Sequence, residues 1–194
     1  RAMPVGEVWS SLEDGHPILA LAPQAARCAA GQSWVWDDVR FEMLHPEPQD
    51  YGRKLKSNAM SCVLRVAAPG VDGHSVLLTG DIERDQEAAL VAARPQALRS
   101  DVLVVPHHGS KTSSTPAFLA AVGPRVAVFQ AGYRNRFGHP AAEVVARYAE
   151  RGIETRVSPA CGAWLWRSDA PDAALCYRDA ARRYWHAGDA AYHR

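Results

Sequence analysis

Residues 101–114, DVLVVPHHGSKTSS, constrain this chain more than any other part of its sequence. Five consecutive apolar residues, 102–106, lead directly into His107 and His108 and then into a turn with glycine. A short unbroken apolar run predicts a strand covered on both faces, as in a sheet with helices packed on it. Side chains at the end of such a strand project into the crevice where α/β proteins bind ligands. We expect one of the two histidines to face such a site, because neighbouring strand residues point in opposite directions; two loop histidines that cap a turn are the alternative.

The rest of the chain predicts hairpins first and then strands alternating with helices. Strands are expected at 6–10, at 33–44 as two strands joined at Asp37-Asp38, at 61–68 and 75–79 around an Asp72-Gly73 turn, and at 124–130, with a closing hairpin in 155–167. Helices are expected at 82–93, at 113–123 with Ser114 or Thr115 as the cap, and at 139–152 from Pro140 to Gly152. Residues 45–58 are rich in Pro, Gly and charge and predict an exposed, mobile loop. This order predicts an α/β fold with helices packed outside a sheet.

Length and composition limit the possible fold and function less tightly than these local patterns do. A chain of 194 residues is long enough for one domain with a real core. The formal net charge of +1 is too small to indicate nucleic-acid binding by itself, and no apolar stretch approaches the roughly 20 residues of a membrane span. The four cysteines lack CxxC spacing, which disfavours a zinc knuckle and leaves buried thiols or disulfides open.

Polar residues follow three successive predicted strands, in TGD (79–81), PHHGS (106–110) and NRFGHP (135–140). Asp81, His107 or His108, and His139 would then converge at one edge of the sheet, and such a cluster suits Zn²⁺, Mn²⁺ or Fe. Each part also has an ordinary explanation, because Gly-Asp and His139 can cap helices and Asn58 and Ser61 can be turn residues. The joint occurrence of the three turns favours a site.

The segments NAMSCVLRV, LLTGDIE, DVLVVPHHGSKTSS, FQAGYRNRFGHP and CGAWLW resemble, in order and from about residue 5 to residue 166, the metallo-β-lactamase-like domain at the C-terminus of ComEC-type competence proteins. Those proteins are bacterial membrane channels that take up single-stranded DNA. The resemblance implies an αββα sandwich with a two-ion Mn or Zn site at one edge of its two sheets. It also implies a nuclease on the extracytoplasmic (periplasmic) face of the inner membrane that degrades the DNA strand not imported, with DNA and the rest of the channel polypeptide as partners.

The same resemblance suggests roles for individual residues. The implied metal ligands are Asp81, His107 and His108; the implied catalytic residues are His139, Asn135 and Ser110; the implied substrate-binding residues are Lys111, Asn58 and Ser61. The principal metal motif of the superfamily, His-x-(His or Asp)-x-Asp-His, is absent from these 194 residues. In the family it lies upstream of the matched segment.

We therefore expect residues 1–168 to be a partial domain that is inactive alone and exposes an apolar face, which would promote association. Residues 169–194 are expected to be a tail, helical in part and packed through Tyr184 and Trp185. Because the family's domain lies where disulfides form, a bridge between Cys28 and Cys161 is a further hypothesis.

Two other functions remain open from the sequence. One is a secreted stand-alone metallo-hydrolase acting on another phosphoester. The other is a non-catalytic module that binds nucleic acid through Lys111, Arg134, Arg136 and the tail.

Overall fold

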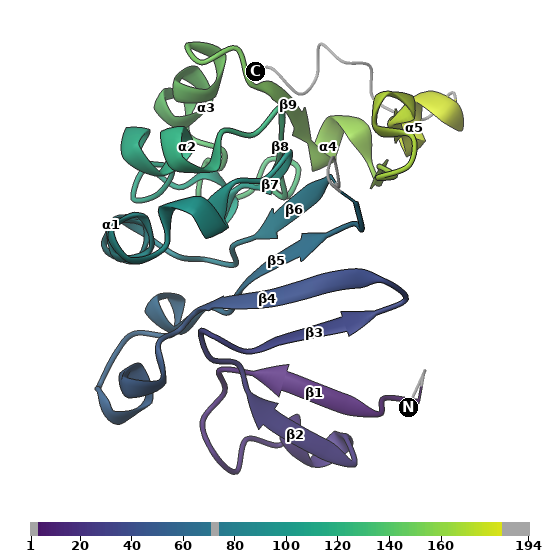
Figure 1. Ribbon diagram of the computed structural model, residues 1–194. Helices are drawn as coiled ribbons and strands as arrows, with labels where there is room; N and C mark the ends of the chain where they lie inside the picture. The colour runs from purple at the N-terminus through teal and green to yellow at the C-terminus, as the bar shows by residue number, and fades with distance from the viewer. Residues whose placement is uncertain (1–3, 71–73, 184–194) are drawn as a thin grey trace.

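A seven-stranded sheet forms the centre of the protein, with its strands in the order in which they occur along the chain (Figure 1). The computed structural model describes residues 4–70 and 74–183. The strands of this sheet are β3 (Ser33–Trp36), β4 (Val39–His45), β5 (Val63–Ala67), β6 (Ser75–Leu78), β7 (Val102–Val104), β8 (Val126–Phe129) and β9 (Glu154–Val157). Two small sheets flank it, one made of β1 (Glu7–Ser10) and β2 (Gln24–Arg27), the other of β10 (Trp164–Leu165) and β11 (Leu175–Cys176).

The central sheet changes character at β6. Strands β3 to β6 pair antiparallel, whereas β6 to β9 pair parallel. Parallel neighbours need a crossover connection, usually a helix. Here the connections carry α1 (Arg84–Ala93), α2 (Pro116–Val122) and α3 (Ala142–Ala149). The predicted mixed α/β class, with hairpins followed by strand–helix alternation, is confirmed, while the Asp72-Gly73 turn lies outside the described residues.

Local sequence signals explain where the helices begin and end. The Thr115 hydroxyl accepts a hydrogen bond from the Phe118 amide at the start of α2, and Gly123 ends that helix in the left-handed conformation. Helix α3 begins at Ala142, two residues beyond the predicted Pro140. Short 3₁₀ turns are η1 (Leu19–Leu21), η2 (Pro48–Gly52), η3 (Asn58–Met60), η4 (Pro95–Leu98), η5 (Pro106–Gly109) and η6 (Pro171–Ala173). The sequence predicts an exposed loop at 45–58, but these residues contain η2 and the start of η3, and the prediction of exposure is wrong at His45 and Asp50, which are buried.

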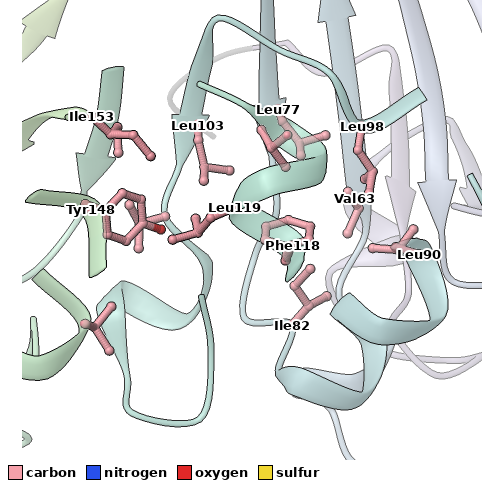
Figure 2. Close-up of a cluster of buried hydrophobic side chains, with 14 of the residues drawn as sticks. Val63, Leu77, Ile82, Leu90, Leu98, Leu103, Phe118, Leu119, Tyr148 and Ile153 are labelled. Carbon is pink, nitrogen blue, oxygen red and sulfur yellow. The ribbon is translucent and has the colours of Figure 1, made fainter. Parts of the chain in front are cut away.

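The core lies between the helices and one face of the sheet (Figure 2). Leu77 and Leu103 point toward the helices and are fully buried. Phe118 and Leu119 of α2 and Tyr148 of α3 close the core from the helix side. Burying side chains of this size contributes roughly 1.5–3 kcal/mol each. This packing fixes the strand ends that carry the predicted site residues.

The opposite face of the sheet is apolar as well, and we call its two central rows the open face. In register order these rows are Val66, Val76, Val102 and Val126, and Leu64, Leu78, Val104 and Val128. Leu78 is 37% exposed, and Val104 is only half-buried. A groove of about 410 Å³ separates part of this face from Trp164 and Trp166. The strand predicted to be covered on both faces is therefore fully covered only on its helix side.

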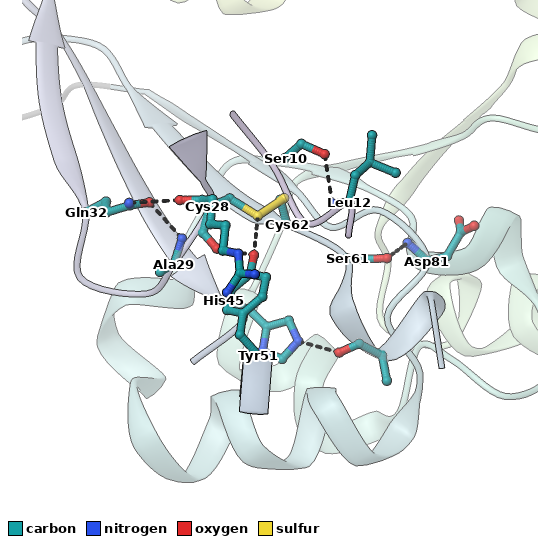
Figure 3. Close-up of a disulfide and its surroundings, with 12 residues drawn as sticks. Ser10, Leu12, Cys28, Ala29, Gln32, His45, Tyr51, Ser61, Cys62 and Asp81 are labelled. Atoms are coloured by element: carbon teal, nitrogen blue, oxygen red, sulfur yellow. Dashed lines mark hydrogen bonds between the residues drawn. A yellow bond between two sulfur atoms is a disulfide. The ribbon is translucent and has the colours of Figure 1, made fainter. Parts of the chain in front are cut away.

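One disulfide ties a peripheral segment to the central sheet, and a second ties α4 (Ser158–Cys161) to the small β10–β11 sheet. Cys28, which follows β2, is bonded to Cys62, which precedes β5 (Figure 3). Cys161 is bonded to Cys176. The hypothesis of a Cys28–Cys161 bridge is wrong, because each of these cysteines has a partner on a nearer segment of the folded chain.

The C-terminal part departs from the predicted hairpin. Strand β9 pairs parallel with β8, and β10 pairs instead with β11 from beyond residue 168. Helices α4 (Ser158–Cys161) and α5 (Tyr177–Ala180) are single turns beside this small sheet. Tyr184 and Trp185 of the predicted tail helix lie outside the described residues. Within the described ranges, no helix is both long and apolar enough to cross a membrane.

Candidate functional site

Three strand-end turns meet at one edge of the sheet. Asp81 follows β6, His107 and His108 follow β7, and His139 lies in the loop between β8 and α3. Because β6, β7 and β8 are adjacent and parallel, their carboxyl ends lie side by side. The His107 ring centroid is 5.9 Å from that of His139 and 6.4 Å from that of His108. We call these four residues the turn cluster.

Asp81 is positioned by close backbone packing. Gly80 has a φ of +55°, and a Cβ there would lie 2.9 Å from the Ser61 Cβ. The Asp81 amide donates to the Ser61 hydroxyl at 3.0 Å (Figure 3). The His107 amide donates to the Gly80 carbonyl at 3.0 Å, which joins the first two turns. Ser61, predicted to bind substrate, thus holds the turn that presents Asp81.

Both adjacent histidines adopt positive φ, 49° at His107 and 55° at His108. This conformation is unusual for residues with a Cβ and is found where the surroundings enforce it, often at functional sites. The alternation expected of a continuing strand does not apply, because the chain has already left β7. The strand geometry behind the expectation that only one histidine faces a site is therefore absent at His107 and His108.

His107 is held on both ring nitrogens. Its Nδ1 lies 3.1 Å from a carboxylate oxygen of Glu83, to which the Thr112 hydroxyl also donates at 2.9 Å. Its Nε2 lies 3.4 Å from the Asn58 side-chain nitrogen. A carboxylate on Nδ1 fixes the tautomer that carries a proton there and leaves Nε2 as the acceptor. Asn58, predicted to bind substrate, contacts this acceptor nitrogen.

His108 faces Asp81 through the opposite nitrogen. Its Nδ1 is 2.6 Å from the Gln130 carbonyl oxygen, so this nitrogen must carry a proton. Its Nε2 lies 3.4 Å from Asp81 Oδ1. With a neutral ring both of these atoms are acceptors, and two acceptors this close favour a proton or a cation that they can share.

His139 is partly buried in the cluster. Its Nδ1 is buried without a hydrogen-bond partner among the described residues. Burial lowers the pKa of His139 below its ordinary value, and His107 and His108 lower it further while Asp81 opposes them. The ring is therefore neutral near pH 7. Phe137 lies nearly parallel to it, with centroids 5.8 Å apart and an interplanar angle of 17°.

Asn135 is occupied inside its own loop. Its amide nitrogen donates to the carbonyls of Gly132 and His139, and its amide oxygen accepts from the amides of Phe137 and His139. With these bonds made, Asn135 positions the loop and has little left to offer a substrate.

Ser110 is buried, and its hydroxyl bonds to Thr112. Lys111 is exposed. Both residues line a hollow of about 680 Å³ with Phe137, Gly138, His139 and Glu143. Of the predicted catalytic and substrate-binding residues, Ser110, Lys111 and His139 are therefore brought together around one open space.

A buried carboxylate fixes the loop from the other side. Glu87 of α1 is fully buried and accepts hydrogen bonds from the Ser114 and Thr115 amides at 2.5 and 2.8 Å. Arg147 of α3 donates to the carbonyls of Ser113 and Ser114. Burial raises the pKa of Glu87, and the hydrogen bonds from Thr115 and Ser114 oppose this rise. The loop is thus clamped to two helices, which gives the turn cluster a rigid support.

The predicted metal site is incomplete in this arrangement. Across the described part of the chain, no three side chains of His, Cys, Asp or Glu are grouped so that they could hold a metal ion. Asp81 and His108 form a close pair, whereas His107 is turned toward Glu83. These residues supply two of the three or more donors that a protein metal site ordinarily needs, so Asp81 and His108 form only part of a metal site.

The sequence interpretation missed three residues. Glu83 and Thr112 hold His107, and Glu87 holds the loop. Glu83 could have been found, because it lies two residues after Asp81 in the same turn and a catalytic histidine often has a carboxylate partner. Glu87 gave no such signal, since an acidic residue near a helix start is common.

Comparisons with known proteins relate this chain to competence proteins. No family model matches it. It is 43% identical over 131 residues to Competence protein ComA of Neisseria gonorrhoeae, 36% over 128 residues to the protein YcaI of Escherichia coli, and 37% over 108 residues to ComE operon protein 3 of Bacillus subtilis. The alignments cover 68%, 66% and 56% of this chain but only 18%, 16% and 13% of those proteins.

Among solved structures, the chain is similar to a metallo-β-lactamase superfamily protein of Thermotoga maritima, with a TM-score of 0.41 and 13% identity, over 79% of this chain and 80% of that one. The matched segment of this chain covers less than a fifth of the length of each of these curated relatives. Over about two thirds of its own length, this chain is therefore similar to one segment of Competence protein ComA and to one segment of YcaI.

Proposed function

We propose that this chain is the phosphodiesterase (nuclease) segment of a bacterial DNA-uptake channel and degrades the strand that is not imported. The observation that carries the proposal is the turn cluster, in which Asp81, His107, His108 and His139 meet at the carboxyl edge of three parallel strands. The similarity to Competence protein ComA of Neisseria gonorrhoeae and to ComE operon protein 3 of Bacillus subtilis supports a role in DNA uptake.

His107 has the geometry of a proton carrier. Its Nδ1 is bonded to the Glu83 carboxylate, and this pairing stabilises the ring when Nε2 takes up a proton. Phosphodiester hydrolysis needs a proton removed from water and a proton given to the leaving oxygen. Neutral His139 can accept the proton from water, and His107, with a proton on Nε2, can give that proton to the leaving oxygen.

Lys111 and the hollow beside His139 give the phosphate a place to bind. The Lys111 ammonium group lines this hollow and would neutralise part of the phosphate charge. Glu143 lines the same hollow but is paired with Arg147 at 3.8 Å, which offsets its repulsion of an anion.

A divalent cation, Mn²⁺ or Zn²⁺, is part of the proposal, with Asp81 and His108 as two of its ligands. Their facing acceptor atoms are the reason for this choice. Bound there, the ion would supply charge stabilisation for the phosphate oxygens. The described residues give no third ligand, and no reaction step is routed through the ion.

The proposed location is the extracytoplasmic face of the bacterial inner membrane, where the rest of a channel polypeptide would be the partner. All four cysteines are paired in disulfides, and disulfides persist in oxidising compartments.

A second candidate function is a non-catalytic nucleic-acid-binding module. The observation that favours it is the exposure of the cationic side chains of Lys111, Arg134 and Arg136.

Calorimetric titration of this chain with Mn²⁺ and Zn²⁺ tests the cation. Wild type should bind at least one ion, Asp81→Ala and His108→Ala should lose that binding, and Asp172→Ala should keep it because Asp172 is exposed and pairs with Arg125 elsewhere. Failure of wild type to bind, or equal binding by every variant, contradicts the cation proposal.

Cleavage of an end-labelled oligonucleotide in Mn²⁺ or Zn²⁺ tests the hydrolysis. Cleavage that falls at least about 100-fold in His107→Ala, the size expected for loss of a proton-transfer group, supports it. Cleavage by the wild-type chain would also overturn the expectation that residues 1–168 are inactive alone. Binding of the oligonucleotide without cleavage overturns the nuclease proposal in favour of the binding module.

A further inference from the structure

The loop between β8 and α3, residues 131–139, exposes two large aromatic rings to solvent. Phe137 is 66% exposed and Tyr133 is 49% exposed. They lie two residues to either side of Asn135, in the sequence Tyr-Arg-Asn-Arg-Phe. Leaving rings of this size in water forgoes about 1.5–3 kcal/mol of burial each, so a role outside the core is the better explanation.

The loop holds these rings in a defined place. Four hydrogen bonds of the Asn135 amide tie its two arms together. At its base, the Ser158 hydroxyl accepts from the Ala131 amide at 3.0 Å and donates to the Ala131 carbonyl at 2.7 Å. Rings presented by such a clamped loop lose little freedom when they bind a partner, which favours affinity.

An arginine guanidinium lies over each exposed ring. The Arg136 guanidinium lies 4.8 Å from the Phe137 ring centroid, and that of Arg134 lies 5.2 Å from the Tyr133 centroid. Lys111 lines a hollow of about 680 Å³ together with Phe137 and His139. Each ring therefore has an arginine beside it and Phe137 shares a hollow with Lys111, while the acid at the hollow, Glu143, is paired with Arg147.

Flat rings beside positive charges match the base and the phosphate of an unpaired nucleotide. A base with a free face stacks on an aromatic side chain, and the phosphate beside it attracts Arg and Lys. In a duplex the bases are stacked on one another and their faces are hidden, so only the phosphates remain for this loop. The loop also ends at His139, whose ring lies nearly parallel to Phe137.

We propose that residues 131–139 form a stacking platform for the bases of single-stranded nucleic acid, with Phe137 as its main ring and Tyr133 as its second. A base on Phe137 places its phosphate in the hollow beside His139 and Lys111. This inference rests on the proposed function, because it names the single strand as the substrate of that same site.

Fluorescence anisotropy with a labelled oligothymidine, and with a duplex of equal length, tests the platform in EDTA, where no cation-dependent cleavage occurs. Phe137→Leu keeps apolar bulk but removes the ring, and it should weaken single-strand binding about 5- to 150-fold, the effect of losing one base–aromatic stack. Duplex binding should change less than about twofold. Trp36→Leu is the matched control, because Trp36 is 68% exposed on β3 and outside the loop.

A second variant checks the electrostatic part. Arg136→Gln should reduce the dependence of log K on log salt by about 0.7 for the single strand, whereas Phe137→Leu should leave that slope unchanged. Circular dichroism of each variant establishes that it folds like wild type, as expected for exposed side chains.

The outcomes separate this inference from the proposed function. If Phe137→Leu binds the single strand as wild type does, or if wild type prefers the duplex, the platform is overturned even when His107-dependent cleavage is present. If binding follows Phe137 but no cleavage occurs, the platform stands and the nuclease proposal fails. Binding of the loop to anionic lipid vesicles without binding to the oligonucleotide would also overturn the platform.

Discussion

Gly109 lets the chain turn back at the two histidines of the cluster. Its φ is +80°, and a Cβ there would lie 2.8 Å from a ring carbon of Phe129 and from the Pro140 Cβ. Gly123 also has a positive φ, +57°, but nothing lies within 4 Å of a Cβ built on it. Comparing substitutions at the two glycines therefore separates the cost of backbone strain from the cost of steric overlap at an added Cβ.

Gly123→Ala should lower the free energy of unfolding by about 1 kcal/mol, the cost of a left-handed alanine. Gly109→Ala should lower it by about 2–4 kcal/mol, because overpacking adds to the strain. Urea denaturation measures both variants. Equal losses would show that the contacts of Gly109 with Phe129 and Pro140 are unimportant.

Glu87 is the buried carboxylate that holds the loop after the cluster. Glu87→Gln replaces one acceptor oxygen by an NH₂ group, so the Ser114 or the Thr115 amide loses its partner. Leaving a buried amide unpaired costs about 1–3 kcal/mol. Unfolding at pH 7 should show this loss, while Glu150→Gln, on the exposed end of α3, should change stability by less than about 0.5 kcal/mol.

The effect of Glu87→Gln on the free energy of unfolding is predicted to depend on pH. Burial raises the pKa of Glu87 above its ordinary 4.5, so the folded state binds this proton more tightly than the unfolded state does. Stability from this group is present below pH 4.5 and is lost as the pH rises through the raised pKa. The difference in unfolding free energy between wild type and Glu87→Gln should therefore be larger at pH 4.5 than at pH 8. A difference that grows with pH would contradict this direction.

At the scale of elements, the disulfides join segments that few other contacts hold. The Cys28–Cys62 bond spans 34 residues and links the β1–β2 pair to the central sheet. Trp9 of β1 also packs on Trp34 of β3, with centroids 4.8 Å apart. The Cys161–Cys176 bond spans 15 residues and holds β11 near α4.

Mapping of unreduced proteolytic peptides should recover Cys28 with Cys62 and Cys161 with Cys176. The double variant Cys28→Ala/Cys62→Ala should lose about 2–4 kcal/mol of stability, because the unfolded chain regains the freedom of a long loop. The Cys161–Cys176 bond closes a shorter loop, so the double variant Cys161→Ala/Cys176→Ala should lose somewhat less stability. Recovery of Cys28 with Cys161 would contradict the observed pairing.

At the scale of the whole molecule, the open face is the main apolar surface turned away from the helices. Apolar surfaces of this kind promote association. Sedimentation of this chain should show species heavier than 21.1 kDa as concentration rises. Leu78→Lys, in the middle of the open face, should reduce this association, whereas Leu21→Lys, 59% exposed in η1, should not. A wild-type chain that stays monomeric at high concentration would contradict the prediction.

Much of the fold was predictable because its signals are local. The alternation of Val39, Phe41 and Met43, the Thr115 cap and the Gly123 stop act within a few residues, and the structure confirms the strand and helices that they predict. The positions of Asp81, His107, His108 and His139 at strand ends followed from the same signals. Their convergence required only that successive strands be parallel neighbours.

The sequence by itself therefore determined the order of the elements and the turns that carry polar side chains, because propensity, periodicity and capping depend on near neighbours. Only the tertiary structure decided which cysteines pair, that both histidines reach the cluster, and that Glu83 and Glu87 support it. It also decided that one face of the sheet stays open. Each of these features depends on contacts between segments distant in the chain, and no local pattern encodes which distant segment arrives.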